Sequence, residues 1–233
     1  MFNGPELGSV TDDNSKGTSS VVSLPPEVYM RLDFIKKVYA ILTCQLIVTA
    51  AISSAISTSD PEWIEHNFGL FWLAFIGSLV TLCTLFVFKN SSPLNLVILG
   101  IFTVFESVLI GFIISMYEQS VVNQAVLATA VLFIGLTVYA FTTKKDYSMS
   151  RGMMWAACLG LISMMLMNII FRSSALDLLI GYVGVIVFSF FIIVDTQFIM
   201  KRCDLDDYVI GAIELYLDII NLFLYLLKMI FNR

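Results

Sequence analysis

The stretch LYLDIINLF at residues 215–223 places one aspartate, Asp218, inside an otherwise apolar run. The run lies in an apolar segment at 208–231, which exceeds the about 20 residues that a membrane-spanning helix needs. A charged side chain in such a helix costs about 2.5–3.5 kcal/mol on insertion scales, so it is a candidate for function. A second aspartate, Asp195, interrupts the preceding apolar segment. These two acids are therefore the first candidates for a functional site.

The composition is that of an integral membrane protein. Of 233 residues, 58% are hydrophobic and 13% are charged, and the mean hydropathy is +0.89. A soluble domain of this size has too little interior to bury so much apolar surface. The net charge of −5 excludes a nucleic-acid binder, which needs a basic face. The single histidine, His66, and the spacing of the four cysteines match no metal or disulfide framework, so we expect no cofactor.

Seven apolar segments are long enough to span a bilayer, which predicts an all-α integral membrane protein. They lie at 38–57, 69–88, 94–116, 120–141, 152–171, 176–200 and 208–231. The last segment is the most polar, so we expect it at the centre, shielded from lipid by the other six. Residues 1–30 are polar and predict a disordered cytosolic tail. Residues 31–233 then form a single seven-helix transmembrane domain.

The basic residues predict the orientation. Ten of the 13 lysines and arginines fall in the amino-terminal flank or in the second, fourth and sixth loops. Since basic residues accumulate on the cytosolic side, the amino terminus is predicted to be cytosolic. Seven full spans put the carboxyl terminus in the lumen. The last segment could instead re-enter the membrane, which is tolerated only within protein; we expect a full span.

A polar stripe runs along the last segment, because Glu214, Asp218, Asn221 and Tyr225 have a 4, 3, 4 spacing that places them on one helical face. At about 1.5 Å per residue, Asp218 lies about 15 Å and Asp195 about 9 Å from the same cytosolic end. Antiparallel neighbours bring these two acids into the same half of the membrane.

Further polar residues extend the candidate site. Glu106 falls near the middle of the third segment and Asp177 at the opposite end of the sixth. We interpret both, together with Glu214 and Asn221, as supporting pore or stripe residues. Lys89 is the best candidate for a counter-charge.

Two readings of the acids remain open. Deep carboxylates without a similarly deep base either take up protons or hold cations, and two that lie close together share a proton. Oxygen ligands suit calcium, so Asp195 and Asp218 predict a pH-tuned cation pathway with transient calcium at the pair. In the other reading the acids are structural, and they form hydrogen bonds to partner helices or pair with nearby bases. A third, remote alternative is an intramembrane aspartyl protease, but no glycine precedes Asp218 to bring a substrate strand close. We therefore do not expect an enzyme.

Several motifs resemble those of the transmembrane BAX-inhibitor-motif family. The stretch at 215–223 resembles the family signature, and FIIVDTQ at 191–197 resembles its second conserved stretch. KKVY at 36–39, PLNL at 93–96 and GLTVY at 135–139 with KKD at 144–146 are similar to the Golgi anti-apoptotic protein branch, in particular to poxvirus-encoded members. The resemblance runs from about residue 31 to residue 225.

The resemblance implies a six- or seven-helix protein of the Golgi and endoplasmic reticulum that permits calcium leak from stores and suppresses apoptosis. It places the family's paired aspartate pH sensor on Asp195 and Asp218. Some members latch this pair with an arginine on the second helix, where this chain has none; Lys89 is the nearest substitute, and it lacks the bidentate geometry of arginine. Calcium is then the permeant ion, lipid and protons are further partners, and the protein is a monomer or a weak homo-oligomer. The alternative that the resemblance leaves open is a non-conducting protein that inhibits cell death by binding death-regulating membrane partners, with structural acids.

Overall fold

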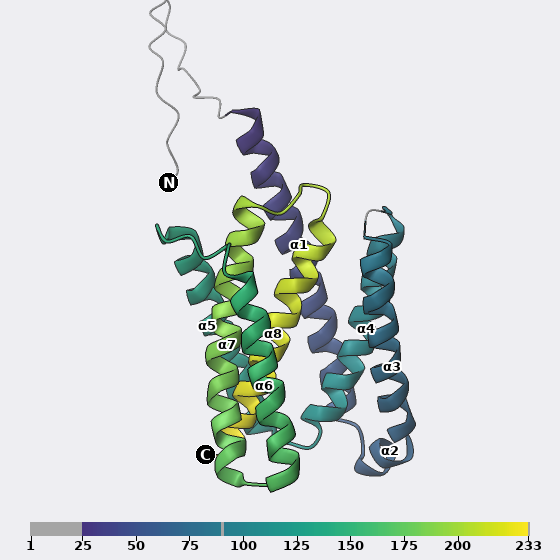
Figure 1. Cartoon of the computed structure of the whole chain (residues 1–233). Coiled ribbons are helices and arrows are strands. Elements are labelled where there is room, and N and C mark those ends of the chain that lie inside the picture. Colours follow the sequence, from purple (N-terminus) through teal and green to yellow (C-terminus); the bar gives the residue numbers. More distant parts are fainter. Residues whose placement is uncertain (1–24, 90, 233) are drawn as a thin grey trace, which may run out of the picture.

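The computed structural model describes residues 25–89 and 91–232, and this part of the chain is built from eight α-helices without a strand (Figure 1). The helices are α1 (Pro26–Ser57), α2 (Pro61–His66), α3 (Phe68–Val87), α4 (Leu94–Ile114), α5 (Gln119–Thr142), α6 (Arg151–Phe171), α7 (Ser174–Lys201) and α8 (Tyr208–Phe231). All except α2 are long and apolar enough to cross a membrane. The prediction of an all-α protein with seven spans is confirmed.

Local sequence explains where several helices begin and end. Pro26 and Pro61 occupy the first helical position of α1 and α2, where a missing backbone N–H leaves no bond unmade. Ser173 caps α7 by accepting a hydrogen bond from the Leu176 backbone N–H. Between α6 and α7, Arg172 adopts a left-handed conformation that ends α6. These signals make the α6–α7 connection only two residues long.

The expected boundaries agree with the observed helices within about two residues at most ends. The main difference is α1, which begins at Pro26 and not near residue 38, so its first three turns come before the predicted span and mix charged with apolar residues. Residues 26–30, assigned to the tail, thus belong to α1, whereas residues 1–24 of that tail lie outside the described residues. The short helix α2, in the connection between the first two spans, was not predicted.

The carboxy-terminal helix α8 is the most buried of the seven spans. It packs directly against α7, α5, α1 and α4, while α3 packs on α4 and α6 packs mainly on α7 (Figure 1). Two α6 side chains still reach α8, Arg151 at Glu214 and Met165 at Tyr225. At about 1.5 Å per residue, the 24 residues of α8 span about 36 Å without interruption, which exceeds the about 30 Å thickness of the hydrocarbon core. The length of α8 therefore indicates a full span and not a re-entrant segment.

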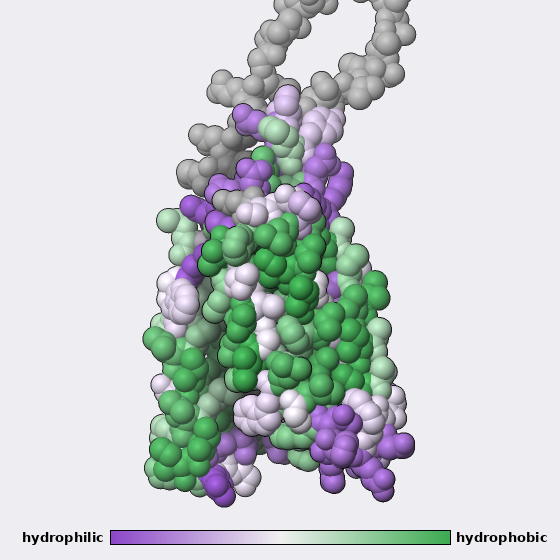
Figure 2. Space-filling model, turned by 90° about the vertical axis from the view of Figure 1, so that its right-hand side faces the viewer, coloured by the Kyte–Doolittle hydropathy of each residue, from purple (hydrophilic) through white to green (hydrophobic). Residues whose placement is uncertain are grey.

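The outer surface of the bundle is apolar. Figure 2 shows a broad hydrophobic surface across the middle of the molecule, with hydrophilic residues gathered toward its ends. Large apolar side chains of the outer helices, such as Trp155 and Ile170 of α6, are each 75% exposed. In water this apolar surface would cause the protein to aggregate, whereas in a bilayer it faces lipid.

Candidate functional site: a buried acid pair near one end of the bundle

The carboxyl groups of Asp195 and Asp218 meet at the contact between α7 and α8. Both side chains are buried, with 2% and 5% of their surface exposed, and they lie within hydrogen-bond reach of each other. The antiparallel packing of α7 on α8 brings together two residues that are 23 positions apart in the chain. One oxygen of each, Asp195 Oδ1 and Asp218 Oδ2, has no hydrogen-bond donor among the described residues. A polar pair in this state is poised to bind a proton or a cation.

Arg151, the first residue of α6, supplies the positive charge at this site. Its Nη2 donates a hydrogen bond to Oε1 of Glu214, and its Nε lies 4.0 Å from Oδ1 of Asp195. The guanidinium also stacks over the Phe198 ring, 4.1 Å from the centroid, which fixes the plane of the fork. Glu214 and Asp218 are one turn apart on α8, so a single arginine faces three acids. We call Arg151, Asp195, Glu214 and Asp218 the acid cluster.

The counter-charge expected from Lys89 comes from Arg151 instead. Lys89 follows the end of α3, which packs on the outer side of α4, away from α7. Its Nζ donates to Oδ2 of Asp207 at 2.9 Å, at the start of α8 and outside the acid cluster. This pair, in which Lys89 is 40% exposed, connects the loop before α4 to the loop before α8.

The other supporting residues do not gather around the aspartate pair. Glu106 is half-buried on α4 and lies beside Ser78 of α3. At the opposite end of the bundle Asp177 pairs with Lys228 at 2.7 Å and accepts a hydrogen bond from Asn168. Asn221 donates to the Leu217 carbonyl of its own helix. Of the expected supporting residues, only Glu214 joins the site.

A residue that the sequence analysis missed, Gln197, anchors the loop beside the acid cluster. It is fully buried two positions after Asp195, and its Nε2 donates to the Lys145 carbonyl at 2.9 Å. Its Oε1 accepts a hydrogen bond from the Tyr147 backbone N–H at 2.6 Å. These bonds hold the α5–α6 loop, whose last residue precedes Arg151. The signal in the sequence was an amide inside the apolar run of α7.

Ionic contacts fasten the same loop to the end of α7. Asp146 lies 3.5 Å from Lys201 and 3.6 Å from Arg202. Hydrogen bonds from the Ser148 hydroxyl and backbone, assisted by Lys201, lower the pKa of Asp146 to about 2. Asp146 is therefore ionised at all physiological pH values and holds the loop in place over the cluster.

The cluster does not form a closed metal site. Within residues 25–89 and 91–232, no three acidic, histidine or cysteine side chains converge in a way that would hold a metal ion. Calcium takes six to eight oxygen ligands, many more than two facing carboxyl groups supply.

Comparison with known proteins identifies the family. Residues 31–233 match the family described as inhibitor of apoptosis-promoting Bax1. Protein lifeguard 4 of Mus musculus is 34% identical, over 94% of this chain and 92% of its own length. The Golgi anti-apoptotic protein of Vaccinia virus (strain Lister) is also 34% identical, over 95% and 93%, and protein LIFEGUARD 2 of Arabidopsis thaliana is 32% identical, over 90% and 91%. The mouse and vaccinia relatives thus have the same identity to this chain. The chain belongs to the Bax1-inhibitor family of multi-pass membrane proteins.

Proposed function

We propose that this protein is an anti-apoptotic cation leak pathway of Golgi and endoplasmic reticulum membranes, which lowers the calcium content of these stores. The observation that carries the proposal is the meeting of Asp195 and Asp218 at the contact between α7 and α8. Each is a buried carboxyl group with one oxygen that accepts no hydrogen bond from the described residues. Stability alone disfavours such a pair, because two apolar side chains would pack there without desolvation. The Golgi and the anti-apoptotic role come from the name of the vaccinia relative.

The acid cluster supplies a mechanism for gating by pH. Two carboxyl groups in contact hold one proton between them, which keeps α7 and α8 together. Loss of that proton puts two negative charges face to face, so the helices separate and a cation takes the place of the proton. Arg151 favours loss of the proton, because its positive charge lies beside Asp195, but it weakens the repulsion between the carboxylates and competes with an incoming cation. Leak is then expected to increase as the pH rises.

The orientation follows from the charges around the cluster. The start of α1 and the loops before α4, α6 and α8 lie at the same end of the bundle as Arg151 (Figure 1). Since these segments carry most of the basic residues, we place this end in the cytosol and the carboxyl terminus in the lumen. The proton that controls the leak would therefore come from the cytosol.

Calcium efflux from liposomes that contain the purified protein tests the proposal. Wild type, Asp218→Asn and Asp195→Asn are compared over about pH 5 to 8, the range in which a shared carboxyl proton titrates when it is strongly held. Asparagine keeps the shape of aspartate but removes the charge. Asp177→Asn is the matched control, because it removes an acid that lies at the other end of α7.

The expected result is a leak that rises with pH in wild type and in the control but is lost in both cluster variants. Leak that persists unchanged in Asp218→Asn would refute the role of the pair. Flux no higher than that of protein-free liposomes would refute the leak itself and would favour a non-conducting protein that acts by binding death-regulating partners.

A further inference from the structure

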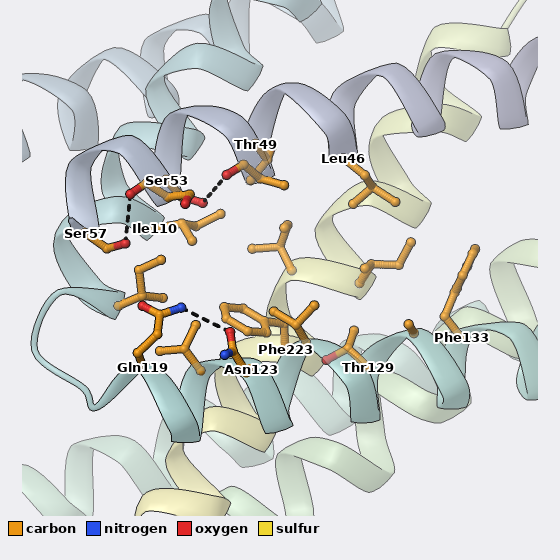
Figure 3. Close-up of a pocket in the computed structure, with 18 of the residues that line it drawn as sticks. Leu46, Thr49, Ser53, Ser57, Ile110, Gln119, Asn123, Thr129, Phe133 and Phe223 are labelled. Atoms are coloured by element: carbon orange, nitrogen blue, oxygen red, sulfur yellow. Dashed lines mark hydrogen bonds between the residues drawn. The ribbon is translucent and has the colours of Figure 1, made fainter.

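A groove of about 530 Å³ opens between α1, α5 and α8, with α4 contributing one edge (Figure 3). Helices α1 and α5 both pack against α8 and meet each other where the rings of Tyr39 and Phe141 lie 6.4 Å apart. The groove lies between the two helices beyond this contact. Its volume falls within the about 300–1,000 Å³ typical of small-molecule sites. In a bilayer, such a gap is filled from the side by whatever the membrane offers.

The groove is separate from the acid cluster. Its floor is formed by Ile219, Ile220 and Phe223 of α8. At about 100° per residue, these side chains project from the side of α8 that faces away from Asp218. A ligand in the groove therefore does not contact the acids.

The polarity of the groove changes along its length. The polar lining is concentrated at one end, where α1 finishes and α5 begins, and includes Ser57, Gln119 and Asn123. Figure 3 shows Gln119 and Asn123 side by side at this mouth, linked by a hydrogen bond of 3.1 Å, whereas Leu46 and Phe133 lie at the opposite end. The groove thus has the shape and the polarity of an amphiphile that points its chain toward the middle of the membrane.

The charges near the mouth of the groove determine which kind of head group can bind there. The lining contains no lysine, arginine or acidic residue among the described side chains. The residue before Gln119 is Glu118, whose carboxylate repels a phosphate placed at the mouth. Amide and hydroxyl groups without a charge recognise hydroxyl and ester groups by hydrogen bonds.

We propose that the groove binds one uncharged, hydroxyl-bearing glycerolipid of the diacylglycerol class. One acyl chain lies along the apolar part over α8, and the glycerol hydroxyl and ester oxygens meet Gln119, Asn123 and Ser57. The lipid would fill the space between α1 and α5 over α8. This proposal does not depend on whether the protein conducts calcium.

Photo-crosslinking in phosphatidylcholine vesicles tests the proposal. The probes are a photoactivatable diacylglycerol and a phosphatidylserine with the same photoactivatable chains, and peptide mass spectrometry locates the labels. Ala50→Phe fills the groove, while Ala51→Phe adds the same ring at an exposed neighbour that does not line it. Asn123→Leu removes a polar group of the mouth, with Gln124→Leu as its control on the outer side of α5.

The expected result is diacylglycerol labelling within residues 46–57 and 119–134 that exceeds phosphatidylserine labelling. Ala50→Phe and Asn123→Leu should each lower it about three- to tenfold, the range that corresponds to one lost hydrogen bond or a comparable contact, and the control variants should not. Equal labelling by both probes would overturn the choice of an uncharged head. Labels elsewhere, or labels insensitive to both groove variants, would overturn the site.

Discussion

Replacement of Gly184 by alanine tests how closely α7 and α8 approach at the turns beyond the acid cluster. A Cβ atom at this position would lie 2.2 Å from Cδ1 and 2.4 Å from Cγ of Tyr225. Cγ is the ring atom attached to the Tyr225 Cβ, so it moves only if the whole side chain rotates or the helices separate. The ring is also held by Phe188, whose stacked centroid is 5.5 Å away.

The expected effect is the difference between two contributions. Glycine to alanine in a helix favours the folded state by up to about 1 kcal/mol, and overpacking a tight site disfavours it by about 1–3 kcal/mol. Gly184→Ala should therefore be neutral to about 2 kcal/mol destabilising. Gly100→Ala on α4 is the control, because a Cβ there would have no neighbour within 4 Å, so only the favourable contribution applies.

Unfolding titrations with sodium dodecyl sulfate in mixed micelles measure both variants. The free energies of unfolding should differ by about 1–3 kcal/mol, with Gly100→Ala the more stable. Tyr225→Ala added to Gly184→Ala should lower stability by less than the two single changes together, because it removes the clash that the first change creates. Equal stabilities of Gly184→Ala and Gly100→Ala would refute the close packing of these helices.

Three further predictions concern other parts of the chain. The pKa of Asp146 lies at about 2, below the about 3.9 of an unfolded aspartate, so its stabilising charge is fully present above about pH 4 and is lost as the pH falls toward 2. The difference in thermal unfolding temperature between wild type and Asp146→Asn should therefore shrink over that interval; a constant difference would contradict it. Burial raises the pKa of Cys203 to about 12, so peptide mass spectrometry should show no alkylation by iodoacetamide near pH 8 until the protein unfolds, and rapid alkylation of the folded protein would contradict this. The side chains of Tyr216 and Thr49 share a hydrogen bond of 2.9 Å, which Tyr216→Phe and Thr49→Val each remove. Each variant should lower the free energy of unfolding by about 0.5–1.5 kcal/mol, and the double variant should lower it by less than the sum. Strictly additive losses would count against the bond.

The number and extent of the spans were predictable because bilayer thickness sets a length that an apolar run must reach. The first helix was underestimated for the same reason. Its first turns, near Arg31, mix charged and apolar residues and so contain no long apolar run. They are held in place by tertiary contacts, since Arg31 donates a hydrogen bond to the carbonyl of Cys203 in the loop after α7. Hydropathy alone does not distinguish a disordered tail from an extension of the helix, because the contact with Cys203 depends on the tertiary structure.

The acid cluster was predictable in depth and in helical face, but not in its partners. Rise per residue gave the depths of Asp195 and Asp218, and the 4-residue spacing put Glu214 on the same face as Asp218. Depth says nothing about direction around the bundle, so Glu106, also near mid-membrane, was assigned to the same route although it faces α3.

Arg151 was misjudged for a related reason. Its position before an apolar run marks it as a loop residue, and only the packing of α6 on α7 turns it toward Glu214 and not toward water. Lys89 has a similar place in the sequence, just after the end of α3. Because α3 packs on the far side of α4, Lys89 forms its ion pair with Asp207. Which of two interfacial bases neutralises a buried acid is therefore decided by the order of helices around α8, a property that no single segment encodes.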